Sequence, residues 1–410
     1  GALGDGLTGL PAGIRLELGP PRAATFASAD LIVLSPGVPS QLPEIVAAQQ
    51  MGVPVTGEVE LAARFIEAPI VAVTGTNGKS TVTSLCGEIA KATGRPAFVG
   101  GNLGTPLVEA VGTPAASADG LVVCECSSFQ LETAERFHPR AAVLLNITPD
   151  HLDRHGTMEA YAAAKMRIAR NLGRGDVLVV NEDDPAVVEA WVRHAGGFVP
   201  AIPYSTRGRP RHHTVRSTGT GAIAVETGGF IDGDGTDLVL RLEGAGGAVT
   251  EERYRTEDLA LTGRHNLGNA LAAFLAMRAS NLASPEAVRE GAARFRPLPH
   301  RMELVGVRGG VRFYDDSKGT NVAAVVASID GFPRPFALIA GGRDKGGSYD
   351  PLVQALRRSN VRGAVLIGES APLIAAALDK DGGVPFPVLR AASMDDAVAA
   401  AHGLCRPGDA

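Results

Sequence analysis

The stretch that decides the fold is Ile70-Val71-Ala72-Val73-Thr74-Gly75-Thr76-Asn77-Gly78-Lys79-Ser80-Thr81. Its first four residues are apolar and predict a short buried strand, and the glycine-rich segment 74–79 predicts a loop. A helix is predicted from about Ser80, because apolar residues follow at 82, 85, 86 and 89 with helical spacing. Backbone N–H groups of such a loop, together with the start of a helix, favour bound phosphate. We therefore predict a nucleotide-binding loop at this position.

Two side chains of the loop have expected roles in phosphate binding. Lys79 should contact the β- and γ-phosphates, and the Ser80 hydroxyl should bind Mg²⁺. The pattern departs from strict G-x-x-x-x-G-K-[ST], because Val73 holds the position of the first glycine and Gly75 supplies the flexibility. A chance Gly-Lys-Ser turn is the alternative, and the strand before and the helix after it argue against that alternative. The loop alone does not separate a kinase, a GTPase and a ligase.

Strands and helices alternate beyond the loop. Apolar runs predict strands at 121–125, 142–146 and 177–181, with helices between them. This alternation predicts an α/β fold with a mostly parallel sheet covered by helices. Residues 206–256 are rich in Gly, Thr and Arg and predict a small antiparallel excursion. A helix is expected from Asn266 to Ala279.

Bulk properties limit the function classes. The chain has 410 residues and a net charge of −5, so no global basic field recruits nucleic acid. Four cysteines form no disulfide framework. No apolar run reaches the ~18 residues of a membrane span, and no signal peptide is visible. We expect a cytoplasmic protein, a monomer, that binds neither nucleic acid nor membranes.

Three polar residues follow or accompany the predicted strands and could complete a metal site. Glu125 ends one strand and His151 follows another, and ligands of parallel sheets bind beyond the carboxyl ends of the strands. Lys165 lies on a helix soon afterwards. Each also has an ordinary interpretation, as a solvent-facing strand end, a loop histidine and a solvated helix lysine.

Several ordered motifs resemble those of the muramyl (Mur) ligase family, which forms amide bonds through acyl phosphates. Segment 74–81 resembles the family's ATP loop. Segments 125–132 (Glu-Cys-Ser-Ser-Phe-Gln-Leu-Glu) and 315–321 (Asp-Asp-Ser-Lys-Gly-Thr-Asn) resemble the members that add D-glutamate. Further matches lie at 100–104, 148–153, 263–266, 299–301 and 341–345.

The resemblance implies a three-domain Mur ligase architecture. The expected parts are a partial Rossmann-like N-terminal domain for the UDP substrate (1–57), a central P-loop ATP-binding domain (58–298) and a Rossmann-like amino-acid-binding domain (299–410). The family's first strand with its Gly-rich turn, and its last Ser-Pro-type segment, have no match here. We therefore expect the sequence to be incomplete at both ends.

The resemblance also implies a role for each matching residue. The expected ATP contacts are Gly75, Thr76, Asn77, Gly78, Lys79, Ser80, Thr81, Asn266, Asn269, Arg301 and Asp316. The expected contacts to the UDP-muramoyl substrate are Ser35, Pro36, Gly37, Asn102, Ser127 and Gln130, and Lys318, Thr320 and Lys345 would lie near the glutamate and the γ-phosphate. Two Mg²⁺ ions are expected, the first on Ser80 and Glu125 and the second on His151 and a carbamylated Lys165. The expected catalytic residues are Lys79, Glu125, His151, Lys165 and Lys318.

The implied reaction is ATP-dependent addition of D-glutamate to UDP-N-acetylmuramoyl-L-alanine, a step of peptidoglycan precursor synthesis. A related ligase that adds L-glutamate or another amino acid is one alternative, because the motifs say little about the configuration of the amino acid. A truncated, non-catalytic nucleotide-binding remnant is another. The presence of Lys79, Glu125, His151 and Lys165 together argues against the remnant, since simple nucleotide binding would not need a second metal site.

Overall fold

The computed structural model describes residues 13–194, 201–212, 214–218, 221–244, 246–261, 263–330, 332–344 and 346–410. The chain divides into two compact units, Gly1–Gly57 and Glu58–Ala410. In the ranges described, no helix combines the length and the apolar character needed to cross a membrane.

The first unit is a small α/β element. Its strands β1 (Ile32–Leu34) and β2 (Val55–Gly57) pair in parallel, and its helices are α1 (Ala23–Ala27) and α2 (Pro43–Gln50). Ile32 and Leu34 alternate with an exposed residue along β1 and pack against Ile45 of α2.

The second unit is built around a nine-stranded sheet with the order β13-β12-β11-β8-β7-β6-β3-β5-β4. The strands from β4 to β11 in this order are parallel to one another. Strand β12 is antiparallel to both of its neighbours, β11 and β13. The strands are β3 (Ile70–Thr74), β4 (Ala97–Gly101), β5 (Leu121–Glu125), β6 (Ala141–Leu144), β7 (Val177–Asn181), β8 (Ala201–Ser205), β11 (Gly228–Ile231), β12 (Asp237–Glu243) and β13 (Val249–Arg255).

Part of the segment predicted as a small antiparallel excursion belongs to this main sheet. Strand β11 continues the parallel order beside β8, and β12 and β13 extend the sheet further. Only β9 (Thr214–Thr218) and β10 (Gly221–Val225) form a separate antiparallel pair. The difference arises because the inner side chains of β12, among them Leu238 and Leu240, are fully buried and pack in the main core.

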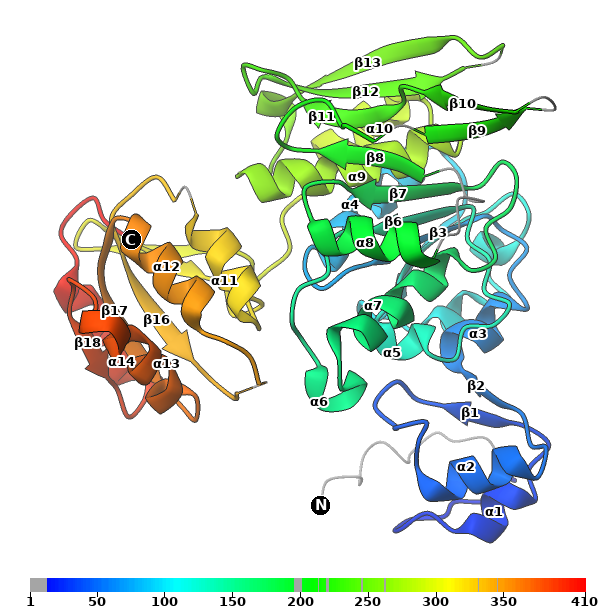
Figure 1. Ribbon diagram of the computed structural model, residues 1–410, viewed down its shortest axis with the longest axis horizontal. Helices are drawn as coiled ribbons and strands as arrows, with labels where there is room; N and C mark the ends of the chain where they lie inside the picture. The colour runs from blue at the N-terminus through cyan, green and yellow to red at the C-terminus, as the bar shows by residue number, and fades with distance from the viewer. Residues whose placement is uncertain are drawn as a thin grey trace. The chain divides into compact units, whose positions relative to one another are not determined.

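Helices cover both faces of the sheet (Figure 1). Val71 and Val73 of β3 face a core with Leu85 of α4, whereas Ile70 and Ala72 face a second core, because side chains alternate along a strand. The first core is completed by α4 (Lys79–Ala92), α9 (Arg264–Ala279) and α10 (Pro285–Arg294), and the second by α3 (Glu58–Ala63), α5 (Ser128–Leu131), α7 (Met158–Met166) and α8 (Pro185–His194).

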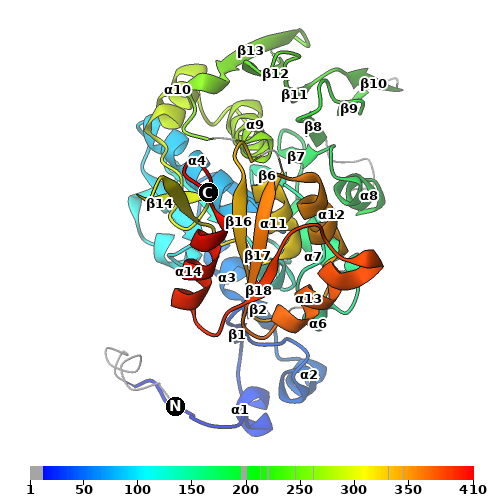
Figure 2. The ribbon, with the colours of Figure 1, turned by 90° about the vertical axis from the view of Figure 1, so that its left-hand side faces the viewer.

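Residues after 300 add two further sheets. β14 (Glu303–Arg308) and β15 (Val311–Asp315) are antiparallel, and β16 (Phe336–Gly341), β17 (Val361–Ile367) and β18 (Val388–Arg390) are parallel. Figure 2 shows the three parallel strands between α14 (Met394–Leu404) on one side and α11 (Val322–Ile329), α12 (Asp350–Arg358) and α13 (Ala371–Asp379) on the other. Val365 packs toward α14 and Leu366 toward the opposite core.

Candidate active site around the phosphate loop

The phosphate loop follows β3, which lies between β5 and β6 in the sheet. Asn146, two residues after β6, holds the loop through its amide. Its Oδ1 accepts from the backbone N–H of Asn77 (2.7 Å), and its Nδ2 donates to the Asn77 carbonyl (2.9 Å). The Thr76 N–H also donates to the Asn146 carbonyl (2.9 Å). Asn146 thus fixes the loop backbone through three hydrogen bonds. The sequence pattern did not predict this role.

Two glycines of the loop have no room for a side chain. A Cβ at Gly75 would lie 2.9 Å from Cβ of Leu145. Gly78 has φ +85°, a left-handed conformation, and a Cβ there would lie 2.5 Å from Oδ1 of Asn269. Close packing against Leu145, just after β6, therefore requires glycine at position 75, and the left-handed backbone beside Asn269 of α9 favours glycine at position 78.

The two phosphate-binding candidates stand at the start of α4, where the helix dipole favours anions. Lys79 Nζ donates to the carbonyls of Gly75 (2.9 Å) and Thr76 (2.7 Å) within its own loop. Ser80 Oγ accepts from Nη2 of Arg301 (3.3 Å). Arg301, predicted as an ATP contact, therefore lies beside the loop.

Lys165 is buried, so its interpretation as a solvated helix lysine is wrong. It is 1% exposed, Nζ donates to the Gly75 carbonyl (2.7 Å), and the ring centroid of Tyr161 lies 4.4 Å away. Burial, and secondarily the charge of Lys79, lower the pKa of Lys165 well below the usual lysine range. A lowered pKa raises the fraction of neutral amine, which is the nucleophilic form of a lysine.

Glu125 is also buried rather than solvent-facing. It is 2% exposed, and β-pairing places it opposite Val73, next to the loop. Its Oε1 accepts from Nδ2 of Asn102 (2.7 Å), whereas its buried Oε2 has no hydrogen-bond partner among the residues that the structure describes. A buried carboxylate oxygen without a partner is unfavourable, and a cation would satisfy it. The arrangement therefore fits a Mg²⁺ ligand.

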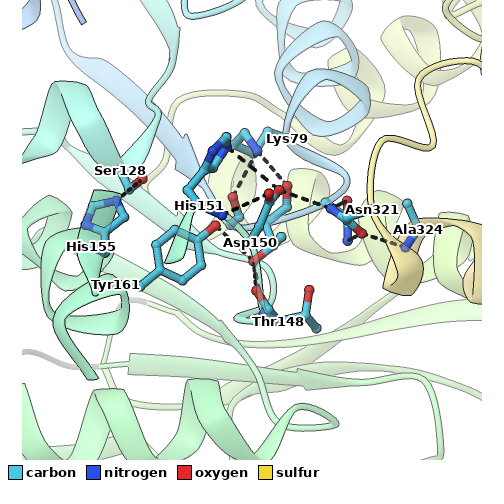
Figure 3. A network of polar contacts seen from close by, with 12 residues as sticks. Lys79, Ser128, Thr148, Asp150, His151, His155, Tyr161, Asn321 and Ala324 are labelled. Carbon is cyan, nitrogen blue, oxygen red and sulfur yellow. Dashed lines mark hydrogen bonds and ion pairs between the residues drawn. The ribbon is translucent and has the colours of Figure 1, made fainter. Parts of the chain in front are cut away.

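The segment after β6 brings His151 to the same edge of the sheet. His151 has φ +55° and precedes α6 (Leu152–His155). Asp150 is 8% exposed, and its Oδ1 accepts from the His151 N–H (3.0 Å). Figure 3 shows Lys79, Asp150, His151 and Tyr161 grouped around the loop. Asp150 contributes electrostatically to the pKa of Lys165, so this carboxylate belongs to the site although it was not among the predicted residues.

Asp184, which lies between β7 and α8, fixes the start of the segment that leads from β6 to His151. Its Oδ2 accepts from the Ile147 N–H (2.8 Å), and burial raises its pKa. The carboxylate also accepts from the Ala186 N–H at the start of α8 (2.9 Å). The position of Asp184 after an apolar run marks it as a candidate site residue in the sequence. Its hydrogen bond to Ile147 could not be predicted from the sequence.

The other expected nucleotide contacts lie on α9 and around β15. Asn269 Nδ2 donates to Asn266 Oδ1 (3.2 Å), so the two amides share one helix face as predicted. Asp316 accepts from the Met302 N–H (3.2 Å) and from Ser328 Oγ (2.6 Å). Lys318 and Thr320 are exposed, and Lys345 lies outside the described residues.

The expected contacts to the UDP-muramoyl substrate are divided between the two units. Ser127 and Gln130 form a capping box at the start of α5, in which Gln130 Oε1 accepts from the Ser127 N–H (2.9 Å). Asn102 is bound to Glu125. In the first unit, residues 35–37 form a turn after β1, closed by a hydrogen bond from the Val38 N–H to the Ser35 carbonyl (2.9 Å).

The described residues contain no group of three or more His, Cys, Asp and Glu side chains placed to hold a metal. The predicted ligand set has a different composition, with one carboxylate, one imidazole, one hydroxyl and one lysine. Ser80 follows the loop, Glu125 pairs with the strand before it, and Lys165 donates to its Gly75 carbonyl. His151, the fourth residue of the set, lies in the group around the loop that Figure 3 shows.

Comparison with known families defines the class of protein. Residues 73–277 match the Mur ligase middle domain, 300–410 the Mur ligase glutamate ligase domain, and 4–57 the MurD-like N-terminal domain. The chain belongs to the Mur ligase family, and the predicted α/β Mur ligase architecture is confirmed.

Within the family, the chain is similar to UDP-N-acetylmuramoylalanine–D-glutamate ligases. It is 43% identical to that of Desulfatibacillum aliphaticivorans and 44% identical to that of Syntrophotalea carbinolica, in each case over 97% of this chain, and covers 81% and 80% of them. It is 43% identical to that of Anaeromyxobacter dehalogenans over 100% of this chain and 84% of the relative.

Solved structures show the same fold at low identity. A pseudomurein peptide ligase type C from Methanothermus fervidus matches with a TM-score of 0.60 and 18% identity, over 97% of this chain and 86% of that one. MurF ligase from Thermotoga maritima in complex with ADP matches with a TM-score of 0.59 and 17% identity, over 95% and 91%.

Proposed function

We propose that this chain is the ATP-dependent ligase that joins D-glutamate to UDP-N-acetylmuramoyl-L-alanine in the cytoplasmic stage of peptidoglycan synthesis. The observation that carries the proposal is the identity of 43–44% to ligases of this name over nearly the whole chain. The phosphate loop supports the use of ATP. We also propose the division 1–57, 58–298 and 299–410, since a different family model matches within each part.

The reaction requires activation of a carboxylate, which is a poor electrophile. Transfer of the γ-phosphoryl group of ATP to the alanyl carboxylate forms an acyl phosphate and ADP. The uncharged amine of D-glutamate then attacks the acyl carbon, and phosphate leaves from the tetrahedral intermediate. The loop amides and the start of α4 would bind the phosphates, and Lys79 would exchange its loop carbonyls for phosphate oxygens of higher charge.

Residues around the loop would hold the nucleotide and the metal. Ser80 and Glu125 would hold one Mg²⁺, and the unpartnered Oε2 of Glu125 supports this assignment. Mg²⁺ would offset charge on the phosphoryl group. Arg301 would approach the phosphates from beside Ser80. Asn269, which packs against Gly78, would contribute to the nucleotide pocket together with Asn266.

Carbamylation of Lys165 is the finer part of the proposal. The neutral amine attacks the carbon of CO₂, an N–C bond forms, and one N–H proton is lost to give a carbamate anion. The lowered pKa of Lys165 supports the neutral amine that this step requires. The carbamate and His151 would then hold a second Mg²⁺. Lys318 would offset phosphoryl charge, and Thr320 and Lys345 would lie near the amino acid.

The test is release of phosphate from ATP in the presence of UDP-N-acetylmuramoyl-L-alanine. D-glutamate, L-glutamate, meso-diaminopimelate and L-lysine are added separately, with a reaction that lacks amino acid as the control. Turnover only with D-glutamate supports the proposal. Turnover with another amino acid would keep the ligase activity and overturn the substrate. A chain that binds ATP but shows no turnover with any amino acid would be a nucleotide-binding protein rather than a ligase.

A further inference from the structure

The side chain of Asn321 connects three separate segments of the second unit. Its Nδ2 donates to Asn77 Oδ1 (3.0 Å) and to Asp150 Oδ2 (3.2 Å), and its Oδ1 accepts from Asn77 Nδ2 (3.2 Å) and from the Ala324 N–H (2.8 Å). A primary amide offers two donors and two acceptor lone pairs. All four positions of this amide are therefore used (Figure 3).

The pairing of Asn321 with Asn77 is a reciprocal amide dimer. Each side chain donates to the other, and the Asn77 backbone is held on both sides by Asn146. Because the backbone is fixed, the direction in which the Asn77 amide leaves the loop is fixed as well. The loop therefore presents a defined donor and acceptor pair to Asn321.

Asn321 is equally well fixed at its own position. It is the N-cap of α11, with an extended backbone (φ −146°, ψ 164°). It directly follows Thr320 and lies three residues after Lys318. Any displacement of the Asn77 amide must therefore act on the backbone that carries these two candidate ligands of the amino acid and the γ-phosphate.

We propose that Asn321 is a positioning residue that couples the phosphate loop to the segment 318–320. The coupling would set the position of the incoming amino acid relative to the bound nucleotide. The inference rests on the proposed ligase function for its kinetic consequence, but the coupling itself does not depend on it. The structural alternative is that Asn321 only caps α11. The two roles need different atoms of the side chain. Capping needs only an oxygen that accepts from the Ala324 N–H, whereas coupling also needs the two N–H donors that bind Asn77 and Asp150.

Two substitutions separate these roles. Ser and Asp cap helices about as well as Asn, so Asn321→Ser and Asn321→Asp should keep α11. Serine cannot form the amide dimer, and aspartate places a carboxylate against that of Asp150. We expect kcat for D-glutamate-dependent phosphate release to fall roughly 10- to 100-fold in Asn321→Ser, from the loss of up to three hydrogen bonds. The fall in Asn321→Asp should be at least as large, whereas the Kd for ADP should change less than kcat in both variants.

A double variant tests whether the two amides act together. If Asn77→Ala and Asn321→Ser remove the same bonds, the double variant should be no slower than the slower single variant. Additive losses would overturn the coupling. Unchanged kcat in Asn321→Ser would also overturn it and leave the residue as a helix cap.

Hydrogen exchange gives a readout that needs no turnover. ADP binding to the wild-type chain should slow amide exchange in residues 318–325, and this protection should be lost in Asn321→Ser. The matched control is Asn171→Ser, which removes two amide hydrogen bonds to the carbonyls of Glu135 and Phe137 and should keep the protection. If the wild type shows no D-glutamate-dependent turnover, the proposed function fails while this measurement still decides the coupling. No protection by ADP in the wild type would refute the coupling itself.

Discussion

Replacing Gly78 with alanine should weaken nucleotide binding strongly while leaving the fold intact. Gly78 precedes α4 with φ +85° and ψ −14°. A left-handed backbone costs a residue with a Cβ about 1–2 kcal/mol. The new Cβ would also lie 2.5 Å from Oδ1 of Asn269. The Asn269 amide must then move, and it would lose its hydrogen bond to Asn266, which contributes about 0.5–1.5 kcal/mol.

The two effects together amount to roughly 2–3 kcal/mol. The loop can relieve both by leaving its left-handed conformation, and bound nucleotide must then restore it. Most of the free energy should therefore appear in binding, as a rise in the Kd for ADP of roughly 30- to 150-fold. Isothermal titration calorimetry of the purified chain with ADP and Mg²⁺ measures this directly.

Gly94 supplies a matched control at the other end of the same helix. It has φ +77°, and a Cβ there meets nothing within 4 Å. Gly94→Ala therefore carries the backbone strain without the collision and lies away from the loop. It should lower the thermal midpoint and leave the Kd unchanged. Equal Kd values for Gly78→Ala and the wild type would refute the argument, as would an equal loss of affinity in both variants.

The remaining predictions concern buried polar groups. Lys165→Met should abolish phosphate release yet raise the thermal midpoint. In CO₂-depleted buffer the wild type should gain stability as pH rises toward the ordinary lysine pKa, because the unfolded chain holds the proton of Lys165 more tightly than the folded chain does; a wild type and a methionine variant with identical pH profiles would contradict this. Glu60→Ala should destabilise the fold by about 2–4 kcal/mol, since its Oε2 accepts hydrogen bonds from the N–H groups of three successive residues that end at Phe137. Chemical denaturation measures the loss, and the control Glu67→Ala should show no such loss. His155→Phe should lower stability by about 1–3 kcal/mol by leaving the Ser128 hydroxyl, 2.9 Å from Nε2, without this partner; adding Ser128→Ala should recover part of the loss, and a further loss in the double variant would count against the explanation.

Local patterns were sufficient to predict the phosphate loop and its flanking elements. Strand β3 and the start of helix α4 lie within one residue of their predicted positions, because apolar spacing and glycine positions act over a few residues. Helix α9 ends at the predicted Ala279 and begins two residues before the predicted Asn266, and its two asparagines share a face through i, i+3 spacing.

The burial of the site residues could not be predicted in this way. Lys165 is buried because its amine reaches the Gly75 carbonyl, 90 residues earlier in the chain, and Glu125 because it pairs with Asn102. Neither partner is visible in the sequence around these residues. Asn146 and Asp150 were missed for the same reason, since their roles follow from contacts with Asn77 and Asn321.

The strand order of the central sheet has a consequence for synthesis of the chain. β3 is buried along its whole length and lies between β5 and β6. Val73 pairs with Glu125 and with Val143, which are 52 and 70 residues further along. At a ribosomal rate of about 5–20 residues per second, both neighbours of β3 become available only after roughly 4–14 s. During this interval a strand with four apolar residues in succession has neither of its sheet neighbours, so a chaperone that binds short apolar segments should bind the nascent chain at residues 70–74.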